Sequence, residues 1–260
     1  DVLSREALCA ALPGWRAPIQ VYATVGSSNQ TAKQLALAGA PHGSLVVAGG
    51  QTEGRGRLGR SFVSPPGKGV YLSMVLRPGG QAADSLAVTG AAAVAVCRAV
   101  ERLCGLRLGI KWVNDLFWQG KKVCGILTEA TIEGETGTVS SLVVGIGVNL
   151  RPNPAWPEEV RQVAGALSEF GAVPRRAAFA AAVLSRFERA YALLESGREA
   201  ELLDRYRSRL CCIGRPVTVI TPAGKYQADC TGLDGNGHLL VRDAQGAVRT
   251  LSSGEISIRL

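Results

Sequence analysis

The sequence predicts an α+β fold, in which helices cover a β-sheet and a small C-terminal β barrel follows. With 260 residues, of which 47% are hydrophobic and 19% charged, the chain has a globular composition and can bury a sizeable core. Up to about residue 210, apolar runs of strand length alternate with long helical patterns. Beyond Cys211 the chain changes to short β-like runs separated by glycine-containing turns. We therefore expect two domains, residues 1–210 and residues 211–260.

The N-terminal part of the chain is predicted to contain one helix and two strands. The helical pattern runs to Leu37, with Asn29 as its expected N-cap and Gly39 at its C-terminal end. Leu45–Ala48 and Val70–Leu76 are apolar runs of strand length. The segment between them is rich in Gly, Arg and Pro, which predicts a loop.

A longer helix and a group of strands are expected next. The helix is predicted over Leu86–Leu103, and Gly105 closes it. Gln119-Gly120 is the expected turn of a hairpin within the group of strands. The strands of this group are Leu106–Trp112, Asp115–Trp118, Lys122–Glu129 and Ser141–Val148.

Two further helical segments are expected to cover one face of the sheet, and the barrel follows them. The helical segments lie near Glu158–Phe170 and Arg176–Glu195, and Gly197 follows the second. Pro-Ala-Gly, Asp-Gly-Asn-Gly and Ala-Gln-Gly sequences separate the strands of the barrel. Those strands are Pro216–Thr221, Lys225–Leu233, His238–Asp243 and Val248–Leu251.

The charge balance is basic, at +8, and only six of the 29 basic residues are lysines, which leaves 23 arginines. Arginine suits phosphates and carboxylates because its planar guanidinium matches their geometry, although GC-rich coding and a solvated surface explain the same bias. The seven cysteines form no CxxC pair and their number is odd, so neither a zinc site nor a complete disulfide framework is predicted. Reduced thiols in the cytoplasm fit best.

No targeting or membrane segment is expected. The most apolar stretch, Leu86–Cys97, is shorter than the ~20 residues that a membrane-spanning helix needs. The first residues lack the basic and apolar regions of a secretory signal. We therefore expect neither secretion nor membrane insertion.

Residues 54–60, called the arginine loop below, read Gly-Arg-Gly-Arg-Leu-Gly-Arg. They match a G-x-G-x-x-G pattern, but the two prolines that follow exclude the helix that a dinucleotide-binding fingerprint must open. The glycines let the backbone approach a ligand, and the three arginines suit an anion, which is expected to order the loop. An exposed basic turn is the alternative interpretation.

Lys111 stands in an apolar strand, where an isolated ammonium group would be costly. It is either a point charge for a phosphate or one half of a structural ion pair, and the sequence leaves both open. The chain has only His42 and His238 and no G-x-S-x-G segment, which disfavours histidine-assisted acyl transfer. A reaction that needs cations to hold phosphates, such as nucleotidyl transfer, fits these residues better.

Six segments occur in the order and spacing that resemble the biotin protein ligases. The closing segment Gly254–Arg259 also resembles the last strand of that family's C-terminal domain. Val113 stands where the family usually has proline, which predicts a looser hold on Lys111. The six segments are Ser27–Gln30, Gln51–Arg60, Tyr71–Ser73, Lys111–Asp115, Lys122–Leu127 and Gly145–Asn149.

The resemblance implies a two-step reaction. Biotin and ATP, with Mg²⁺, would form biotinyl-5'-AMP and pyrophosphate. A lysine of a biotin carboxyl carrier protein or domain would then attack the mixed anhydride. The implied fold is a mixed sheet with helices, related to class II tRNA synthetases, followed by an SH3-like barrel.

The resemblance also implies roles for individual residues. The catalytic residues would be Lys111, Arg55 and Arg57. Metal ligands are not located, and the adenine pocket has only two candidates, Asn149–Glu159 and Gly254-Glu255. The adenylate would meet Arg57, Arg60, Lys111, Asn114 and Asn149. Biotin would meet Ser27, Ser28, Asn29, Gln51, Gly54, Arg55, Gly56, Arg57, Tyr71, Ser73, Lys111, Gly125 and Gly145.

Two alternatives remain at this point. A lipoate or octanoate protein ligase would share the core fold, although the arginine loop and Lys111–Asp115 favour biotin. A non-catalytic basic module that binds RNA belongs to another class, but the barrel strands offer it only Tyr226 as an aromatic side chain. Too few residues precede Ser27 for a helix-turn-helix domain, so we expect no specific DNA binding. The oligomeric state is left open, a homodimer included.

Overall fold

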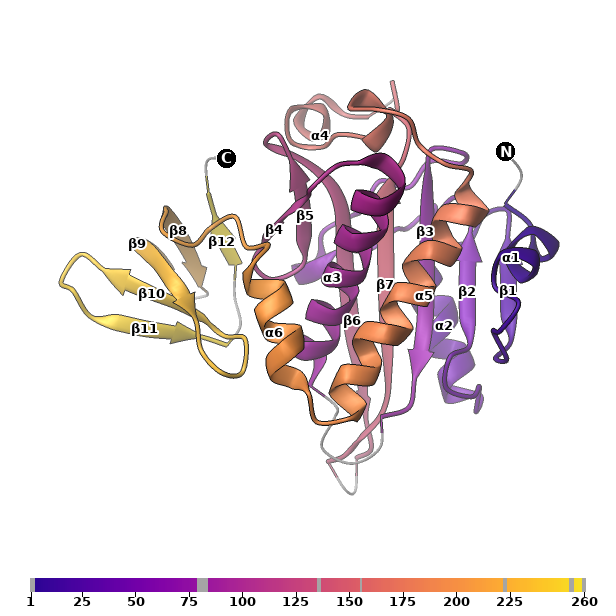
Figure 1. Ribbon diagram of the computed structural model, residues 1–260, viewed down its shortest axis with the longest axis horizontal. Helices are drawn as coiled ribbons and strands as arrows, with labels where there is room; N and C mark the ends of the chain where they lie inside the picture. The colour runs from indigo at the N-terminus through magenta and orange to yellow at the C-terminus, as the bar shows by residue number, and fades with distance from the viewer. Residues whose placement is uncertain are drawn as a thin grey trace.

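The larger part of the chain is built on a seven-stranded sheet, with strand order β1-β2-β3-β7-β6-β5-β4 (Figure 1). The computed structural model describes residues 3–78, 84–134, 137–154, 156–221, 224–252 and 255–258. β1 and β2 pair in parallel and the other neighbours pair antiparallel, so the sheet is mixed, as the resemblance implies. The strands are β1 (Ile19–Tyr22), β2 (Leu45–Ala48), β3 (Gly69–Leu76), β4 (Gly109–Lys111), β5 (Asp115–Trp118), β6 (Lys121–Ile132) and β7 (Val139–Asn149).

Helices cover both faces of this sheet. α3 and α5 cross one face, whereas α2 packs against β2, β3 and β7 on the other (Figure 1). No helix in the described part of the chain is long and apolar enough to span a membrane. The helices are α1 (Arg5–Ala11), α2 (Ser28–Leu37), η1 (Arg57–Gly59), α3 (Ser85–Cys104), α4 (Glu158–Val163), η2 (Leu167–Glu169), α5 (Arg176–Glu195) and α6 (Glu199–Arg207).

Alternate residues of the central strands point into two different cores. Leu72 and Met74 of β3 belong to the larger core, under α3 and α5, whereas Val75 belongs to the smaller core under α2. All eight residues of β3 are buried. Because both faces are covered, these strands are continuous apolar runs rather than alternating patterns.

The predicted N-cap of α2 was wrong. The helix begins at Ser28, the capping position is Ser27, and Asn29 lies inside the first turn. Gly39 does adopt the left-handed conformation expected after the helix, with φ of 89°. The earlier start places Ser28 and Asn29 at the end of the helix that faces β6 and β7.

Other elements differ from the prediction in length or were not predicted. The helical segment expected near residues 158–170 is two short helices, α4 and η2, because Ala164–Ala166 is extended and Gly165 N–H donates to Lys122 O. α1 and α6 were not predicted. α6 buries Leu202 and Tyr206 against the larger core.

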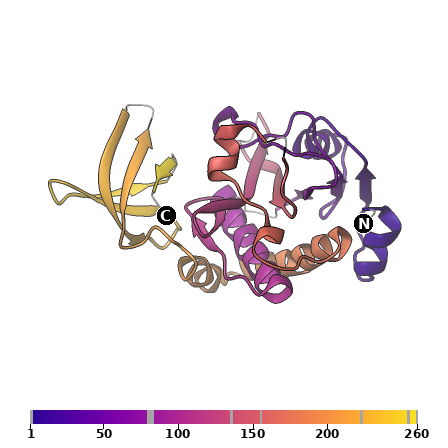
Figure 2. The ribbon, with the colours of Figure 1, turned by 90° about the horizontal axis from the view of Figure 1, so that it is seen from above.

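The C-terminal part forms a five-stranded antiparallel sheet with order β11-β10-β9-β8-β12. Among the described residues, no ladder closes β11 onto β12, so the expected barrel is an open, curved sheet (Figure 2). Gly254 and Arg259, on which part of the predicted resemblance rests, lie outside the described residues. The strands are β8 (Pro216–Thr221), β9 (Gly224–Leu233), β10 (Leu239–Asp243), β11 (Val248–Leu251) and β12 (Glu255–Ser257).

Candidate functional site

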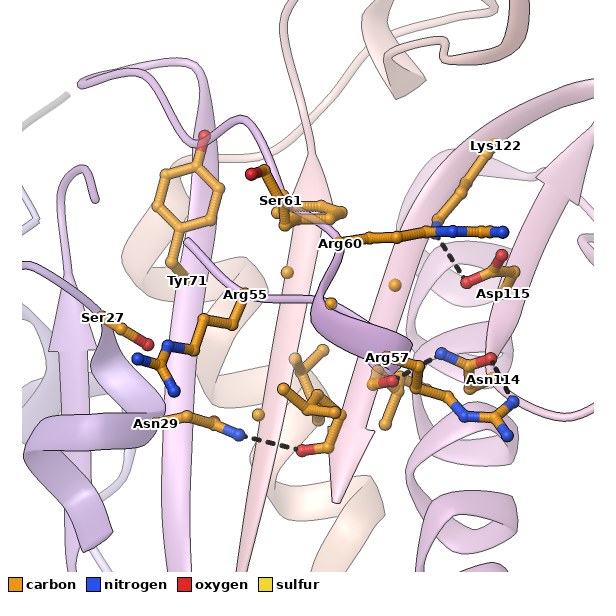
Figure 3. Close-up of a pocket in the computed structure, with 18 of the residues that line it drawn as sticks. Ser27, Asn29, Arg55, Arg57, Arg60, Ser61, Tyr71, Asn114, Asp115 and Lys122 are labelled. Atoms are coloured by element: carbon orange, nitrogen blue, oxygen red, sulfur yellow. Dashed lines mark hydrogen bonds and ion pairs between the residues drawn. The ribbon is translucent and has the colours of Figure 1, made fainter. Parts of the chain in front are cut away.

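A cavity lies on the side of the sheet that α2 covers, where the start of α2, the arginine loop and strands β4 to β7 meet. Most of the predicted site residues line it, although they come from six separate segments of the chain. Figure 3 shows side chains from these segments facing a common space. The predicted residues that line the cavity are Ser27, Ser28, Asn29, Gln51, Arg55, Gly56, Arg57, Arg60, Tyr71, Lys111, Asn114, Gly125 and Gly145.

Three predicted site residues do not line the cavity. Ser73 is fully buried behind it. Gly54 is packed so closely against Phe62 O and Ser64 Oγ that a Cβ would not fit. Asn149 is buried and its amide donates to Gly165 O at 3.2 Å, so the structure shows it holding the connection after β7. A contact between Asn149 and an adenylate stays a prediction.

A hydrogen-bonded network of neutral side chains forms one end of the cavity. The Ser28 hydroxyl and backbone N–H both donate to Gln51 Oε1, at 2.9 and 2.8 Å. The Gln51 amide donates to Ser64 Oγ at 2.7 Å. The Ser73 hydroxyl lies 2.9 Å from Ser28 Oγ and 2.7 Å from Asn29 Oδ1. Because these residues hold one another, the network fixes the direction of its donors and acceptors before a ligand binds.

Glu129 of β6 ends this network. Its Oε2 accepts a hydrogen bond from Asn29 Nδ2 at 2.9 Å, and Leu127 O accepts from the same nitrogen at 3.1 Å. A carboxylate only accepts, so the NH₂ group of Asn29 faces Glu129 and its Oδ1 faces Ser73. Gly145 leaves no room for a Cβ beside that Oδ1. The Asn29 amide is therefore held in one orientation.

Two glycines on neighbouring strands form the floor of the cavity. Gly125 of β6 and Gly147 of β7 are direct partners, and the ring of Phe62 lies against both. A Cβ at position 147 would approach Phe62 Cε1 to 2.6 Å, and a Cβ at position 125 would approach Cε2 to 3.1 Å. Tyr71 meets Phe62 edge-on, with ring centroids 6.4 Å apart. The two glycines thus make room for the Phe62 ring, which forms the apolar floor of the cavity.

Cationic side chains of the arginine loop form the other end. Arg55 and Arg57 point in different directions, and Arg57 Nη1 lies 3.3 Å from Asn114 Oδ1 (Figure 3). Arg60 also lines the cavity. The loop turns through the short helix η1, in which Leu58 has a positive φ of 55° and is 71% exposed. None of the residues of η1 is buried, so little packing holds the tip of the loop.

The structure distinguishes between the two interpretations of Lys111. A structural ion pair exists, but it joins Asp115 to Lys122, with 2.7 Å between Oδ1 and Nζ. Lys111 makes no ion pair or hydrogen bond within the described residues, and its Nζ lies 5.9 Å from the centre of the Phe117 ring. Its charge is therefore free for an anionic ligand in the cavity.

Two buried hydrogen bonds hold the segment after Lys111, and the looser hold expected without a proline at position 113 stays a prediction. The hydroxyl of Tyr206 donates to Val113 O at 2.8 Å, and Trp112 Nε1 donates to Gly237 O at 3.1 Å. Burial raises the pKa of Tyr206, so its hydroxyl keeps its proton and remains a donor at neutral pH. Helix α6 and the C-terminal sheet therefore both support the strand that carries Lys111.

The cavity combines three chemical environments. A neutral polar end offers fixed donors and acceptors, the floor offers apolar contact, and the cationic end and Lys111 offer positive charge. Within the described ranges, no three His, Cys, Asp or Glu side chains gather as a metal site.

Comparisons with known proteins identify the family of this chain. Residues 21–149 match the Biotin/lipoate A/B protein ligase family, and residues 212–259 match the Biotin protein ligase C terminal domain. The chain is 35% identical over 241 residues to the Bifunctional ligase/repressor BirA of Bacillus subtilis, covering 92% of this chain and 73% of that protein. The chain belongs to the biotin protein ligase family.

Other relatives agree with this assignment. The Biotin--[acetyl-CoA-carboxylase] ligase of Paracoccus denitrificans is 32% identical, over 86% of this chain and 94% of that protein. The biotin protein ligase from Aquifex aeolicus in complex with biotin and ATP superposes with a TM-score of 0.80 and 28% identity, over 94% of this chain and 99% of that one. The family and its mixed-sheet fold were thus predicted correctly from the motifs, and the alternative of a non-catalytic RNA-binding module is not supported.

Several cavity or network residues were not assigned to the site in the sequence-based prediction. They include Phe62, Ser64, Asp115, Lys122, Glu129 and Gly147. Lys122 and Asp115 lie within motifs that carry the resemblance, so the signal was present. Glu129 stands two residues after the motif that ends at Leu127, and only the contact with Asn29, 100 residues earlier in the chain, identifies it.

Proposed function

We propose that this chain activates biotin with ATP as biotinyl-5'-AMP and transfers the biotinyl group to a lysine of a biotin carboxyl carrier protein or domain. One observation carries the proposal: a fixed neutral network faces the arginine loop and Lys111, whose ammonium group has no partner among the described residues, across one cavity. Biotin has the matching shape, with a neutral ureido ring at one end and a carboxylate at the other. The match of residues 212–259 to the biotin-specific C-terminal domain favours biotin over lipoate.

The neutral end of the cavity is the proposed site for the ureido ring. Ser28 and Gln51 are held by the network, and the hydroxyl of Ser27 makes no hydrogen bond within the described residues and faces the cavity. The apolar part of biotin would lie against the Phe62 ring, which packs on Gly125 and Gly147. Its carboxylate would then point towards Lys111 and the arginine loop.

In the first step, an oxygen of the biotin carboxylate attacks the α-phosphorus of ATP, and pyrophosphate leaves. Negative charge builds on the α-phosphate oxygens, and Lys111, Arg55 and Arg57 are the proposed groups that stabilise it. Asn114, which accepts from Arg57, would position that guanidinium. Mg²⁺ would arrive with ATP and neutralise part of the phosphate charge.

In the second step, the ε-amino group of the carrier lysine attacks the carbonyl carbon of the anhydride. An amide forms, AMP leaves, and the lysine loses a proton. The proposed role of the arginine loop in this step is to keep the adenylate in place until the carrier docks. The C-terminal domain, proposed as residues 211–260, supports the site through the hydrogen bond between Trp112 and Gly237.

A cytoplasmic location is also proposed. All seven cysteines are free thiols, which suits a reducing compartment. ATP and carboxylase carrier domains are available there.

Isotope exchange between pyrophosphate and ATP tests the proposal, because it isolates the first step and needs no carrier protein. The exchange is measured with biotin, with lipoate and with neither. We expect exchange that depends on biotin alone. Exchange supported by lipoate instead, or no exchange by folded protein, would overturn the assignment.

A further inference from the structure

A second, smaller cavity lies on the helical side of the molecule, away from the site described above. α3 and the C-terminal end of α6 form it, together with the segment that follows each helix. Its volume is about 80 Å³. Four of its seven lining residues are arginines, which the family assignment does not explain. The lining residues are Val94, Cys97, Arg98, Arg107, Arg205, Ser208 and Arg209.

Arg209 is the most buried of the four arginines, with 12% of its side chain exposed. One of its terminal nitrogens, Nη2, pairs with Glu101. The other, Nη1, is buried and has no hydrogen-bond partner in the part of the chain that the structure describes. A charged N–H group that is buried without a partner costs free energy, so this nitrogen lacks an acceptor that a bound anion would supply.

The other three arginines leave positive charge at the cavity mouth. Arg98 and Arg107 are exposed and form neither an ion pair nor a hydrogen bond with any described residue. Within the described ranges, the Arg205 guanidinium has only a long contact with Glu201, at 3.5 Å. The four guanidinium groups of the cavity are thus paired there with two carboxylates, Glu101 and Glu201.

The positive potential extends beyond the cavity along α3 and α5. The pKa of Arg186 is lowered, first by partial burial and then by repulsion from Arg189, Arg102 and Arg98. Repulsion of this kind is relieved when an anion binds between the arginines. The cavity is therefore electrostatically prepared for an anion and sterically open to one.

We propose that this cavity binds the phosphate group of a small molecule, either inorganic phosphate or a phosphomonoester. Guanidinium groups bind phosphate oxygens through paired, charge-assisted hydrogen bonds. A cavity needs roughly 10–15 Å³ of water-accessible volume to hold one water molecule, so a volume of about 80 Å³ leaves room for a phosphate group. The rest of a phosphomonoester would have to lie outside the cavity, next to Arg98 and Arg107.

A bound phosphate would act on the junction between the two domains. The carbonyl of Arg209 accepts a hydrogen bond from Ile110 N–H at 2.7 Å, and Cys211 N–H donates to Ile110 O at 2.9 Å. Residues 209–211 thus pair with β4, whose next residue is Lys111. Phosphate that fixes the Arg209 side chain would stabilise this pairing.

The test compares phosphate binding by the full-length wild-type chain and by the double variant Arg98→Gln/Arg107→Gln, using calorimetric titration at fixed ionic strength. Inorganic phosphate and glycerol 3-phosphate are the two probes. The loss of two charge-assisted pairs predicts an affinity lower by roughly a hundredfold, at about tenfold for each pair. Tighter binding of glycerol 3-phosphate would identify a phosphomonoester as the ligand, and tighter binding of inorganic phosphate would identify the free ion.

Two controls make the result specific. Arg16→Gln/Arg175→Gln removes the same charge from exposed positions outside the cavity and should leave the affinity unchanged. Arg55→Gln/Arg57→Gln removes cations of the biotin and ATP site and should also leave it unchanged. Equal loss in either control, or full affinity in Arg98→Gln/Arg107→Gln, would overturn the proposal. The cavity variant should keep biotin-dependent pyrophosphate exchange, so this test does not depend on the proposed enzymatic function.

Discussion

The neutral end and the cationic end of the cavity beside α2 differ in how firmly the structure holds them. At the neutral end, Ser28, Asn29 and Ser73 are buried and hydrogen-bonded to one another, with distances of 2.7 to 2.9 Å. At the cationic end, no residue of η1 is buried, Leu58 is 71% exposed, and Arg55 has no side-chain hydrogen bond within the described residues. Most side chains of the neutral end hold one another without a ligand, whereas Arg55 and Lys111 present charge that no described residue pairs with.

This difference suggests that the two ends have different roles in binding and in the reaction. The rigid end recognises a neutral, polar group, and a fixed arrangement costs no ordering entropy when that group binds. The loosely held end meets groups whose charge changes during the reaction. Its ordering would be driven by the phosphate that it stabilises, so closure of the loop and chemistry would be coupled.

Loss of the Lys111 ammonium group should have the largest effect on the rate of adenylation. Lys111→Ala is expected to slow adenylation in a single turnover by roughly a hundredfold to a thousandfold, which is the usual effect of removing one preorganised donor to a developing oxyanion. Rapid-quench measurement of adenylate formation checks this. Lys225→Ala, at an exposed position of β9, is the control. A normal adenylation rate in Lys111→Ala would remove this residue from the chemistry.

The next largest effect is expected in the arginine loop. Arg57→Ala should release biotinyl-5'-AMP faster, because a guanidinium beside the acyl phosphate is lost. The released adenylate would then biotinylate lysines of unrelated proteins. Dissociation of radiolabelled adenylate, compared with that from Arg16→Ala, measures the effect. An unchanged dissociation rate would contradict the proposed role of Arg57.

The neutral end should respond through binding rather than through rate. Glu129→Leu removes the acceptor that orients Asn29, and we expect the KM for biotin to rise about tenfold, as for one lost hydrogen bond to a charged group. The KM for ATP and kcat should change little. Glu129→Gln can still present an oxygen to Asn29 and should restore most of the affinity. An equal loss in both variants, or a fall in kcat alone, would show that Glu129 does not position the network.

The smallest effect concerns acid stability of the C-terminal sheet. A hydrogen bond from Arg249 Nε at 2.9 Å, together with backbone N–H groups of Ala247 and Gln245, lowers the pKa of Asp243. The ionised form is therefore favoured by folding, so its contribution is present above the ordinary Asp pKa and is lost as the pH falls through the lowered pKa. Urea unfolding of wild type and Asp243→Asn should differ at neutral pH and converge at acidic pH. A constant difference would contradict this assignment.

Regular elements with local signals were predictable from the sequence. Arg176–Glu195 and Val248–Leu251 have the expected bounds, and Gln119 and Gly120 both have the positive φ of the expected turn. α6 was not predicted, because it is short and most of its residues are charged. Its stability comes from burial of Leu202 and Tyr206 against distant parts of the chain, which no local pattern reveals.

Site residues that lie in motifs were predictable from the sequence. The hydrogen-bond and ion-pair partners of these residues were not. The sequence placed an ammonium group in a strand at position 111 without showing which residue pairs with Asp115. The register of β4 and β5 sets Lys111 opposite Asp115, but Asp115 pairs with Lys122 of β6, and Lys111 has no ion pair within the described residues. Likewise, the barrel was expected from strand lengths and turns, whereas closure depends on pairing between its first and last strands in space.

Hydrogen–deuterium exchange tests the contrast between the two ends most directly. The backbone amides of residues 54–61 are compared with those of residues 28–31, without ligand and with biotinyl-5'-AMP. We predict slow exchange of residues 28–31 in both states, and exchange of residues 54–61 that is fast without ligand and slow with it. Equal protection of both segments without ligand, or no change in residues 54–61 on binding, would contradict the account.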